Sequence, residues 1–117
     1  MAVSASHRKR IRDRLNRALQ LIESRPAAPP GDAELARVCG VSIRQMQRMF
    51  ANAHATSAQA FGLAVRLDLA HALLLHSPLT IIEIALISGF PSTSHFTKRY
   101  RERFKMAPSG HRGKQSR

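Results

Sequence analysis

The sequence contains one short pattern twice, and this internal repeat limits the possible folds more than any other feature. ELARVCGV at 34–41 resembles EIALISGF at 83–90, so the offset between the copies is 49 residues. After Pro91 the offset becomes 50, and Met46 then aligns with Phe96. A fixed offset usually marks one supersecondary unit used twice. Each copy carries a small Ala and, four residues later, a Gly, which suits two closely packed helices joined by a sharp turn. The repeated unit is therefore expected to be a helix-turn-helix.

The hydrophobic pattern of the whole chain is helical. Apolar residues recur three and four positions apart, whereas the alternation typical of strands is almost absent. The segment RPAAPPG at 25–31 interrupts this pattern and predicts a linker. Helices are expected at 8–24, 32–39, 43–53, 58–76, 81–88 and 93–104, with a last short turn within 106–112.

Small polar residues stand where several of these helices begin. Such residues cap helices because their side chains accept hydrogen bonds from free backbone N–H groups. Two of them are followed three residues later by Gln or Glu, which is the spacing of a capping box. The predicted caps are Asp32, Ser42 with Gln45, Ser57, Thr80 with Glu83, and Ser92.

These elements predict an all-α chain in which a long helix joins two helix-turn-helix subdomains. The expected division is a first unit with its leading helix at 8–56, a linking helix at 57–77 and a second unit at 78–112. The basic residues 113–117 are expected to form a disordered tail.

The net charge points to a polyanionic partner. The chain has 19 Lys and Arg against 7 Asp and Glu, a formal charge of +12, and such an excess opposes compaction. Nucleic acid is the leading candidate and a membrane surface the second. No apolar run approaches the roughly 18 residues of a membrane span. The beginning of the chain, MAVSASHRKRIRD, lacks the apolar centre of a secretory signal. We therefore expect a cytoplasmic protein that joins the nucleoid when bound to DNA and has no membrane partner.

The second helix of each unit is expected to enter the major groove of DNA. Some residues of these two helices are expected to face the core and so cannot contact DNA. They are Ile43, Met46, Met49 and Phe50 in one helix, and Phe96, Tyr100 and Phe104 in the other. The remaining faces carry side chains that pair with base edges, such as Arg with guanine and Gln with adenine. The predicted base contacts are Arg44, Gln47, Arg48, Ser94, His95, Lys98 and Arg99. The predicted phosphate contacts are the caps Ser42, Ser57, Thr80 and Ser92.

Two other classes of function fit the sequence less well. Enzyme chemistry is disfavoured, because the chain has no Gly-rich phosphate loop, no paired-His metal motif and no nucleophile elbow. His71 and His76 lie five residues apart, which is the wrong spacing for one helical face, and Cys39 is the single cysteine. We therefore expect that the chain is not an enzyme and that it has no metal site and no cofactor. A nonspecific nucleic-acid binder or a helical protein-interaction module would explain the charge but not the repeated turn.

Four segments resemble the DNA-binding domain of AraC/XylS-type bacterial transcription regulators. They are ELARVCGVSIRQMQRMF, RLDLAHALL, TIIEIALISGFPSTSHFTKRYRERF and APSGHR, and the similarity covers about residues 10–112. The resemblance implies two homeodomain-like helix-turn-helix units joined by the helix at 58–76. It also implies that recognition helices at 43–53 and 93–104 enter successive major grooves of double-stranded promoter DNA and regulate transcription. Arg66 matches a family position in the linking helix, and its alternative, purely structural role would be a salt bridge across the domain.

The chain departs from the family pattern at four positions. Ala58 replaces a frequent Pro, Lys105 a Gly, Ala107 a Ser or Thr, and His111 a Tyr, which leaves the geometry of 104–112 open. Many such regulators also carry an amino-terminal domain that senses a ligand and dimerises. The resemblance thus implies either a fragment of a larger regulator or a stand-alone activator, and we expect the fragment. RNA polymerase would be a further partner.

Overall fold

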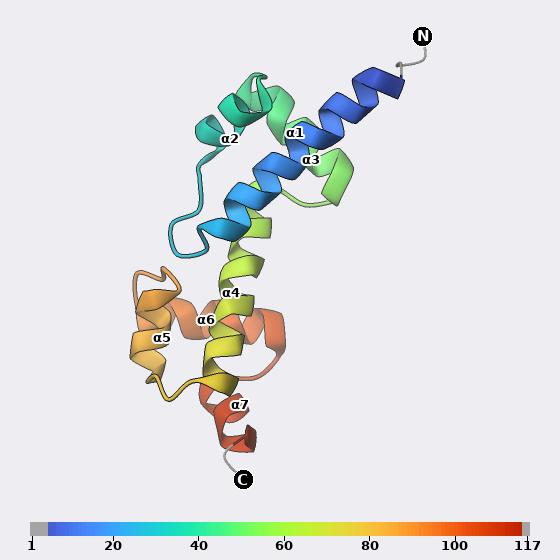
Figure 1. The fold of residues 1–117 in the computed structure, drawn as a ribbon. Helices are drawn as coiled ribbons and strands as arrows, with labels where there is room; N and C mark the ends of the chain where they lie inside the picture. Colours follow the sequence, from blue (N-terminus) through green and yellow to red (C-terminus); the bar gives the residue numbers. More distant parts are fainter. Residues whose placement is uncertain (1–4, 116–117) are drawn as a thin grey trace. The chain divides into compact units, whose positions relative to one another are not determined.

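The computed structural model describes residues 5–115, and every regular element in that range is a helix (Figure 1). The all-α prediction is therefore confirmed, and the expected helices are found within a few residues of their predicted ends. The helices are α1 Ala5–Ser24, α2 Asp32–Cys39, α3 Ile43–His54, α4 Ala58–His76, α5 Ile81–Ile87, α6 Thr93–Phe104 and α7 Pro108–Gln115.

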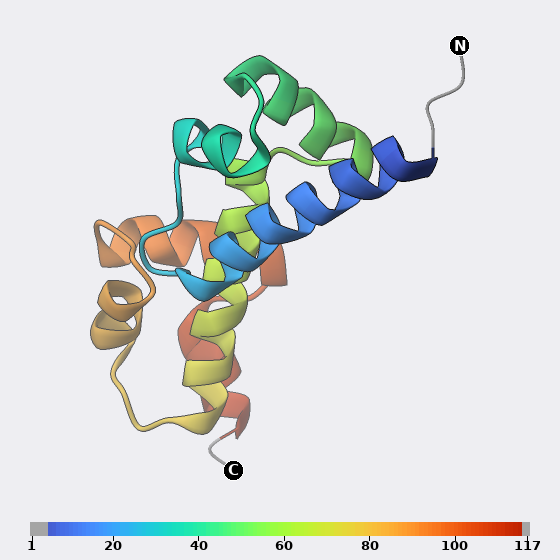
Figure 2. The same cartoon turned by 45° about the horizontal axis from the view of Figure 1, so that its top comes forward.

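The chain forms two compact units, each built around one helix-turn-helix. Unit 1 comprises Met1–Arg25 and Pro29–Gly62, and unit 2 comprises Pro26–Ala28 and Leu63–Arg117. Helix α4 thus contributes its first turn to unit 1 and its remainder to unit 2. Within unit 1, α2 and α3 follow each other across a short turn, as do α5 and α6 within unit 2 (Figure 2).

The turns of the two units have the same construction. Gly40 follows α2 with φ of 69°, and Gly89 follows α5 with φ of 84°, so both occupy the left-handed region that suits Gly. The residue after each Gly donates its backbone N–H to the carbonyl of Ala36 at 3.1 Å or of Ala85 at 2.9 Å. Both alanines are buried, at 4% and 2% exposure, so the first helix of each pair lies tight in its unit. The helix-turn-helix predicted from the repeat is confirmed in both copies.

The repeat extends to the ends of the second helices. Ala55 after α3 and Lys105 after α6 are both left-handed, with φ of 55° and 60°, and each donates its N–H back into the helix. Lys105 thus adopts the conformation for which the resembling family uses Gly. The departure at this position leaves the end of α6 in place, and α7 begins at Pro108.

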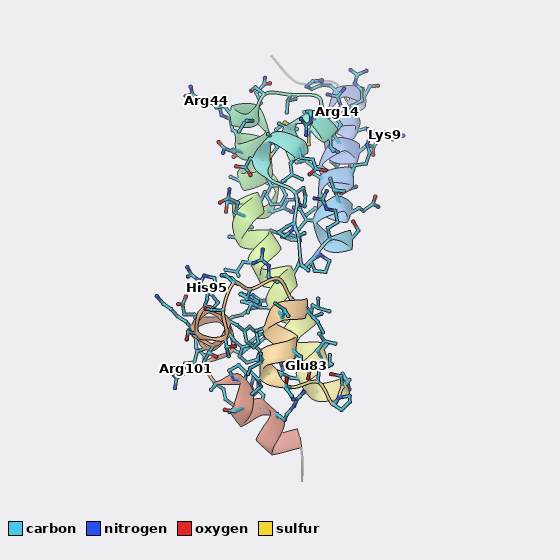
Figure 3. All side chains as sticks on the ribbon, turned by 90° about the vertical axis from the view of Figure 1, so that its left-hand side faces the viewer. Lys9, Arg14, Arg44, Glu83, His95 and Arg101 are labelled. Carbon is cyan, nitrogen blue, oxygen red and sulfur yellow. The ribbon has the colours of Figure 1, made fainter. Side chains whose placement is uncertain are left out.

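Four of the five predicted helix caps are confirmed. Ser42 and Thr80 form complete capping boxes with Gln45 and Glu83. The hydrogen bond from the Thr80 backbone N–H also lowers the pKa of the Glu83 carboxyl, which Figure 3 labels in unit 2. The hydroxyls of Ser57 and Ser92 accept from backbone N–H groups three residues later, at 3.0 and 3.1 Å.

The prediction that Asp32 caps α2 is wrong. Gly31 occupies the N-cap position in an extended conformation, and Asp32 is the first residue of the helix. Its carboxylate still suits the positive end of the helix dipole. Its Oδ2 atom accepts a hydrogen bond from Gln47 of α3 at 2.8 Å. The side chain is therefore used between helices instead of closing the first turn.

Each unit has its own apolar core. Met46 and Phe50 of α3 are fully buried, but Ile43 remains 45% exposed, so its prediction as a core residue is wrong. Ile43 is the first residue of α3, where the helix end has packing neighbours on fewer sides. The core of unit 1 comprises Leu15, Ala18, Ile22, Leu35, Ala36, Cys39, Met46, Phe50 and Ala58. The core of unit 2 comprises Leu67, Ala70, Leu74, Ile84, Ala85, Phe90, Phe96 and Tyr100.

Helix α7 is anchored by Arg112, whose guanidinium donates to backbone carbonyls at and after the end of α4. The carbonyls at the end of a helix lack the full set of intrahelical partners, and the contact adds a charged donor there, although the carbonyl of Leu73 also accepts from Ser77. The acceptors are the carbonyls of Leu73, Leu74, Ser77 and Leu79. With this anchor the backbone stays helical to Gln115, and the predicted disordered tail is wrong for 113–115. Its last residues, 116–117, lie outside the described range.

Tyr100 joins three helices of unit 2 through one hydroxyl. The hydroxyl lies 2.8 Å from Nδ1 of His71 on α4 and 2.5 Å from Nδ1 of His111 on α7. A phenol has one proton, so it donates to one imidazole and accepts from the other. Burial raises the pKa of Tyr100 to about 12. His111, where the resembling family has Tyr, thus contributes to the packing of α7.

Helix α4 is long and apolar enough to span a membrane by length and composition alone. However, Arg66 and Asp68 interrupt its apolar sequence. Its residues Leu67, Ala70 and Leu74 are buried in the core of unit 2. This burial is typical of a core helix.

Candidate nucleic-acid interface

Helix α3 presents a basic face on the outside of unit 1. Arg44, Gln47 and Arg48 are all exposed, while Met46 and Phe50 turn inward and fix the rotation of the helix. Figure 3 shows Arg44 reaching outward, on the side of unit 1 opposite to Lys9 of α1. The three side chains predicted to contact bases in unit 1 therefore share one solvent-facing surface.

The two glutamines of α3 have different local partners. Gln45 accepts from the backbone N–H of Ser42 at 3.2 Å and so belongs to the capping box. Gln47 instead donates its Nε2 amide to Asp32 of α2 at 2.8 Å. The exposed Gln47 is therefore held by a residue of the neighbouring helix, a contact that the sequence analysis did not identify.

Helix α6 presents the corresponding face of unit 2. Ser94 and Lys98 are exposed, as predicted, and both line an open surface depression. Sequence reasoning missed Thr97 and Arg101, which line the same depression. The signal was present, because Arg101 lies seven residues after Ser94 and three after Lys98, so the three share a helical face. Figure 3 views α6 almost end-on and shows Arg101 projecting outward. The depression is lined by Thr93, Ser94, Thr97, Lys98, Arg101 and Glu102.

His95 and Arg99, the other two predicted base contacts, already have partners in unit 2. The ring of His95 packs 5.8 Å from that of Phe90, and its Nδ1 atom is buried without a hydrogen bond. Arg99 pairs with Glu102 at 3.3 Å one turn along the helix. Both are half-buried, whereas Ser94 and Lys98 are exposed. The structure therefore brings Lys98 and Ser94 to the outer face more fully than His95 and Arg99.

Two arginines of unit 2 hold the helices that carry this face. The guanidinium of Arg66 lies 5.2 Å from the centre of the Phe90 ring, and its Nε atom is buried without a hydrogen bond. Burial accordingly lowers the pKa of Arg66. The salt bridge expected for Arg66 is replaced by this cation–π contact. Arg103 of α6 makes the ion pair instead, with two-pronged contacts to Asp68 of α4 at 3.0–3.2 Å.

The four predicted phosphate contacts lie at helix starts and are exposed. Each hydroxyl of Ser42, Ser57, Thr80 and Ser92 accepts one backbone N–H at 3.0–3.1 Å. A hydroxyl that accepts in a cap keeps its own proton for donation. The hydroxyl of Ser42 already donates to Oε1 of Gln45 at 3.4 Å. The helix starts at Ser57, Thr80 and Ser92 offer an O–H donor together with a positive dipole end, which is a suitable combination for a phosphate oxygen. Among the described residues, no group of three or more His, Cys, Asp or Glu side chains is placed to hold a metal ion.

Comparison with known proteins gives consistent matches. Residues 35–114 match a family model described as a helix-turn-helix domain. The HTH-type transcriptional regulator GbdR of Pseudomonas aeruginosa is 37% identical over 99 residues, which are 85% of this chain and 27% of that protein. The chain thus spans about a quarter of the length of the curated relatives it matches.

Solved structures of similar fold include two informative examples. A transcriptional regulator of the AraC type from Chromobacterium violaceum superposes with a TM-score of 0.84 at 31% identity, covering 91% of this chain and 95% of that one. The DNA-binding domain of AdpA, solved in complex with a target DNA, gives a TM-score of 0.72 at 20% identity and covers 88% and 89%. The second likeness concerns the fold alone.

Proposed function

The chain belongs to the AraC-type family of helix-turn-helix DNA-binding domains, and from this premise we propose that it binds specific double-stranded DNA sequences and thereby regulates transcription. Helices α3 and α6 are the recognition helices in this proposal, each in one of two successive major grooves. The observation that carries it is the duplicated construction: each unit fixes its second helix with the same turn and presents a basic outer face.

In unit 1 the proposed base contacts are Arg44, Gln47 and Arg48. They stand in the amino-terminal part of α3, the part that reaches base edges in such motifs. In unit 2 the exposed Ser94 and Lys98 are the stronger candidates, and we propose Arg101 as a further contact because it lines the same depression. His95 and Arg99 are secondary, because each already packs or pairs within the unit. The four cap hydroxyls are proposed to position the protein on phosphates.

The proposed partner is promoter DNA in the cytoplasm. An interaction with RNA polymerase and a separate effector domain are further proposals that rest on the family. The curated relatives are several times longer than this chain, which leaves room for such a domain in them. No enzymatic activity is proposed.

Selection of bound sites from a random duplex pool tests the function directly. We expect a motif of two half-sites about one helical turn, roughly 34 Å, apart. Binding to the selected site should weaken steeply with salt, with a slope of about −0.9 per neutralised phosphate. A chain that bound all duplexes equally at physiological salt would instead be a nonspecific nucleic-acid binder, and the proposal would fail.

A further inference from the structure

The hydrogen bond between Asp32 and Gln47 links the first turn of α2 to the outer face of α3. Nε2 of Gln47 donates to Oδ2 of Asp32 at 2.8 Å. An ionised carboxylate only accepts hydrogen bonds, so the amide nitrogen must face Asp32 and the amide oxygen must face elsewhere. The bond therefore fixes which end of the Gln47 amide is turned toward Asp32.

This contact is a feature of unit 1 that the repeat does not require. At the offset of 49 the counterpart of Asp32 is Ile81, which packs half-buried against the core of unit 2. At the offset of 50 the counterpart of Gln47 is Thr97. Asp32 does not cap its helix either, because Gly31 occupies that position. The carboxylate is therefore not needed to build the helix-turn-helix.

We propose that Asp32 is a positioning residue that sets the base preference of Gln47. The inference rests on the proposed function, in which Gln47 meets a base edge. Asp32 does not read DNA itself in this scheme. It acts through the amide that it orients.

The chemistry follows from the two ends of an amide. A freely turning Gln can offer its N–H groups to the acceptors of guanine, or its oxygen to the amino group of adenine or cytosine. With one N–H held by Asp32, Gln47 offers its oxygen together with its second N–H. Adenine satisfies both through its amino group and N7, and cytosine satisfies the oxygen alone. Guanine and thymine place a carbonyl oxygen against the Gln47 oxygen, so they are disfavoured.

The experiment measures binding of the whole chain to duplexes that carry each of the four bases at the position contacted by Gln47. That position is identified as the one whose preference Gln47→Ala abolishes in the selected site. Asp32→Leu removes the acceptor and places an apolar residue where the second unit has Ile81. Asp32→Asn removes the charge and keeps an oxygen acceptor. Asp13→Asn is the matched control, because it removes a carboxylate from the exposed surface of α1.

For the wild type we expect adenine to be preferred over guanine and thymine by about tenfold or more at this position. Asp32→Leu should reduce that ratio to about threefold or less, while preferences at all other positions persist. Asp32→Asn should retain most of the preference. In the Gln47→Ala background, Asp32→Leu should cause no further change in base preference.

Three results would overturn the inference. In the first, Asp32→Leu leaves the base preference unchanged and raises the affinity as Asp13→Asn does. Asp32 would then act only as a surface charge that repels DNA. Loss of preference at every position would mean that Asp32 merely supports the fold of unit 1. A wild type with no preference at any position would remove the proposed function and this inference together, whereas the first two results leave the function standing.

Discussion

Substitution of the two turn glycines by Ala should destabilise the units to different extents. Gly40 and Gly89 are both left-handed, and the left-handed conformation costs an L-residue about 1–2 kcal/mol. Replacing Gly by Ala also restricts the unfolded chain, which stabilises the fold by about 0.4–1 kcal/mol. The net destabilisation from the left-handed backbone alone is therefore about 1 kcal/mol. At Gly40 a new Cβ would meet only the end of the Arg14 side chain, at 3.8 Å. Gly40→Ala is therefore expected to cost about 1 kcal/mol.

Gly89 has a second constraint, because its surroundings leave no room for a side chain. A Cβ there would lie 2.1 Å from the carbonyl oxygen of Ala27, 2.8 Å from its carbon and 2.9 Å from its Cα. These are backbone atoms, so the linker segment within unit 2 would have to move by about 1 Å to restore normal contact distances. Overpacking of this kind costs about 1–3 kcal/mol. The total for Gly89→Ala is therefore about 2–4 kcal/mol.

Urea unfolding of both variants measures this difference. Tyr100 is the single tyrosine and the chain has no tryptophan, so tyrosine emission reports on unit 2 alone, and circular dichroism reports on all helices. Asn replacements separate the two costs, because Asn tolerates the left-handed region but still carries a Cβ. Gly40→Asn should be nearly neutral, and Gly89→Asn should remain destabilising. Equal losses of stability for Gly40→Ala and Gly89→Ala would refute the argument from the Ala27 contact.

Three further outcomes are expected. Arg48→Ala and Lys98→Ala should each weaken binding by about 1–3 kcal/mol through one base position, which lies in a different half-site for each variant. Binding to duplexes with single base changes measures this loss. A uniform loss over all sequences would make the residue a phosphate contact. The phenol of Tyr100 should titrate near pH 12 in an absorbance titration. Its neutral form therefore contributes about 2–3 kcal/mol to the stability of unit 2 below pH 10, and this contribution is lost as the pH rises through 12. Tyr100→Phe should remove that part of the pH dependence. Arg112→Ala should loosen α7, since it removes the donor to the carbonyls of Leu74 and Ser77 at and after the end of α4. Faster amide exchange in 108–115 would report this.

Local sequence rules predicted the helices and their ends because the determining residues lie within a few positions of each other. The capping boxes at Ser42 and Thr80 and the left-handed Gly40 and Gly89 all belong to this class. The misassigned cap at Asp32 arose because a long-range partner, Gln47, competes for the same carboxylate. The preference of Asp for the N-cap position takes no account of a partner from another helix.

Contacts between distant segments could not be predicted from a single sequence. The approach of Ala27 to Gly89 depends on where the linker segment packs, and periodicity does not describe a linker. The half-burial of His95 has another cause, because it depends on how the turn between α5 and α6 places Phe90 against it. Arg101 differs from these cases, because its spacing from Ser94 and Lys98 places it on their helical face in the sequence itself. The exposure of Arg44, Gln47 and Arg48 in α3 follows from the helical pattern, whereas in α6 the pattern left out Thr97 and Arg101.

The two copies of the unit share their construction and differ on their outer faces. Turn glycines, buried alanines and N-cap serines recur, because the fold requires them in each copy. The exposed counterparts diverge: Arg44 corresponds to Ser94, and Arg48 corresponds to Lys98. A planar guanidinium can pair with guanine through two fixed hydrogen bonds, whereas an ammonium is a mobile point charge. If both faces meet DNA, α3 should therefore contribute more to base discrimination than α6. A selected site should then be more strictly defined in one half than in the other.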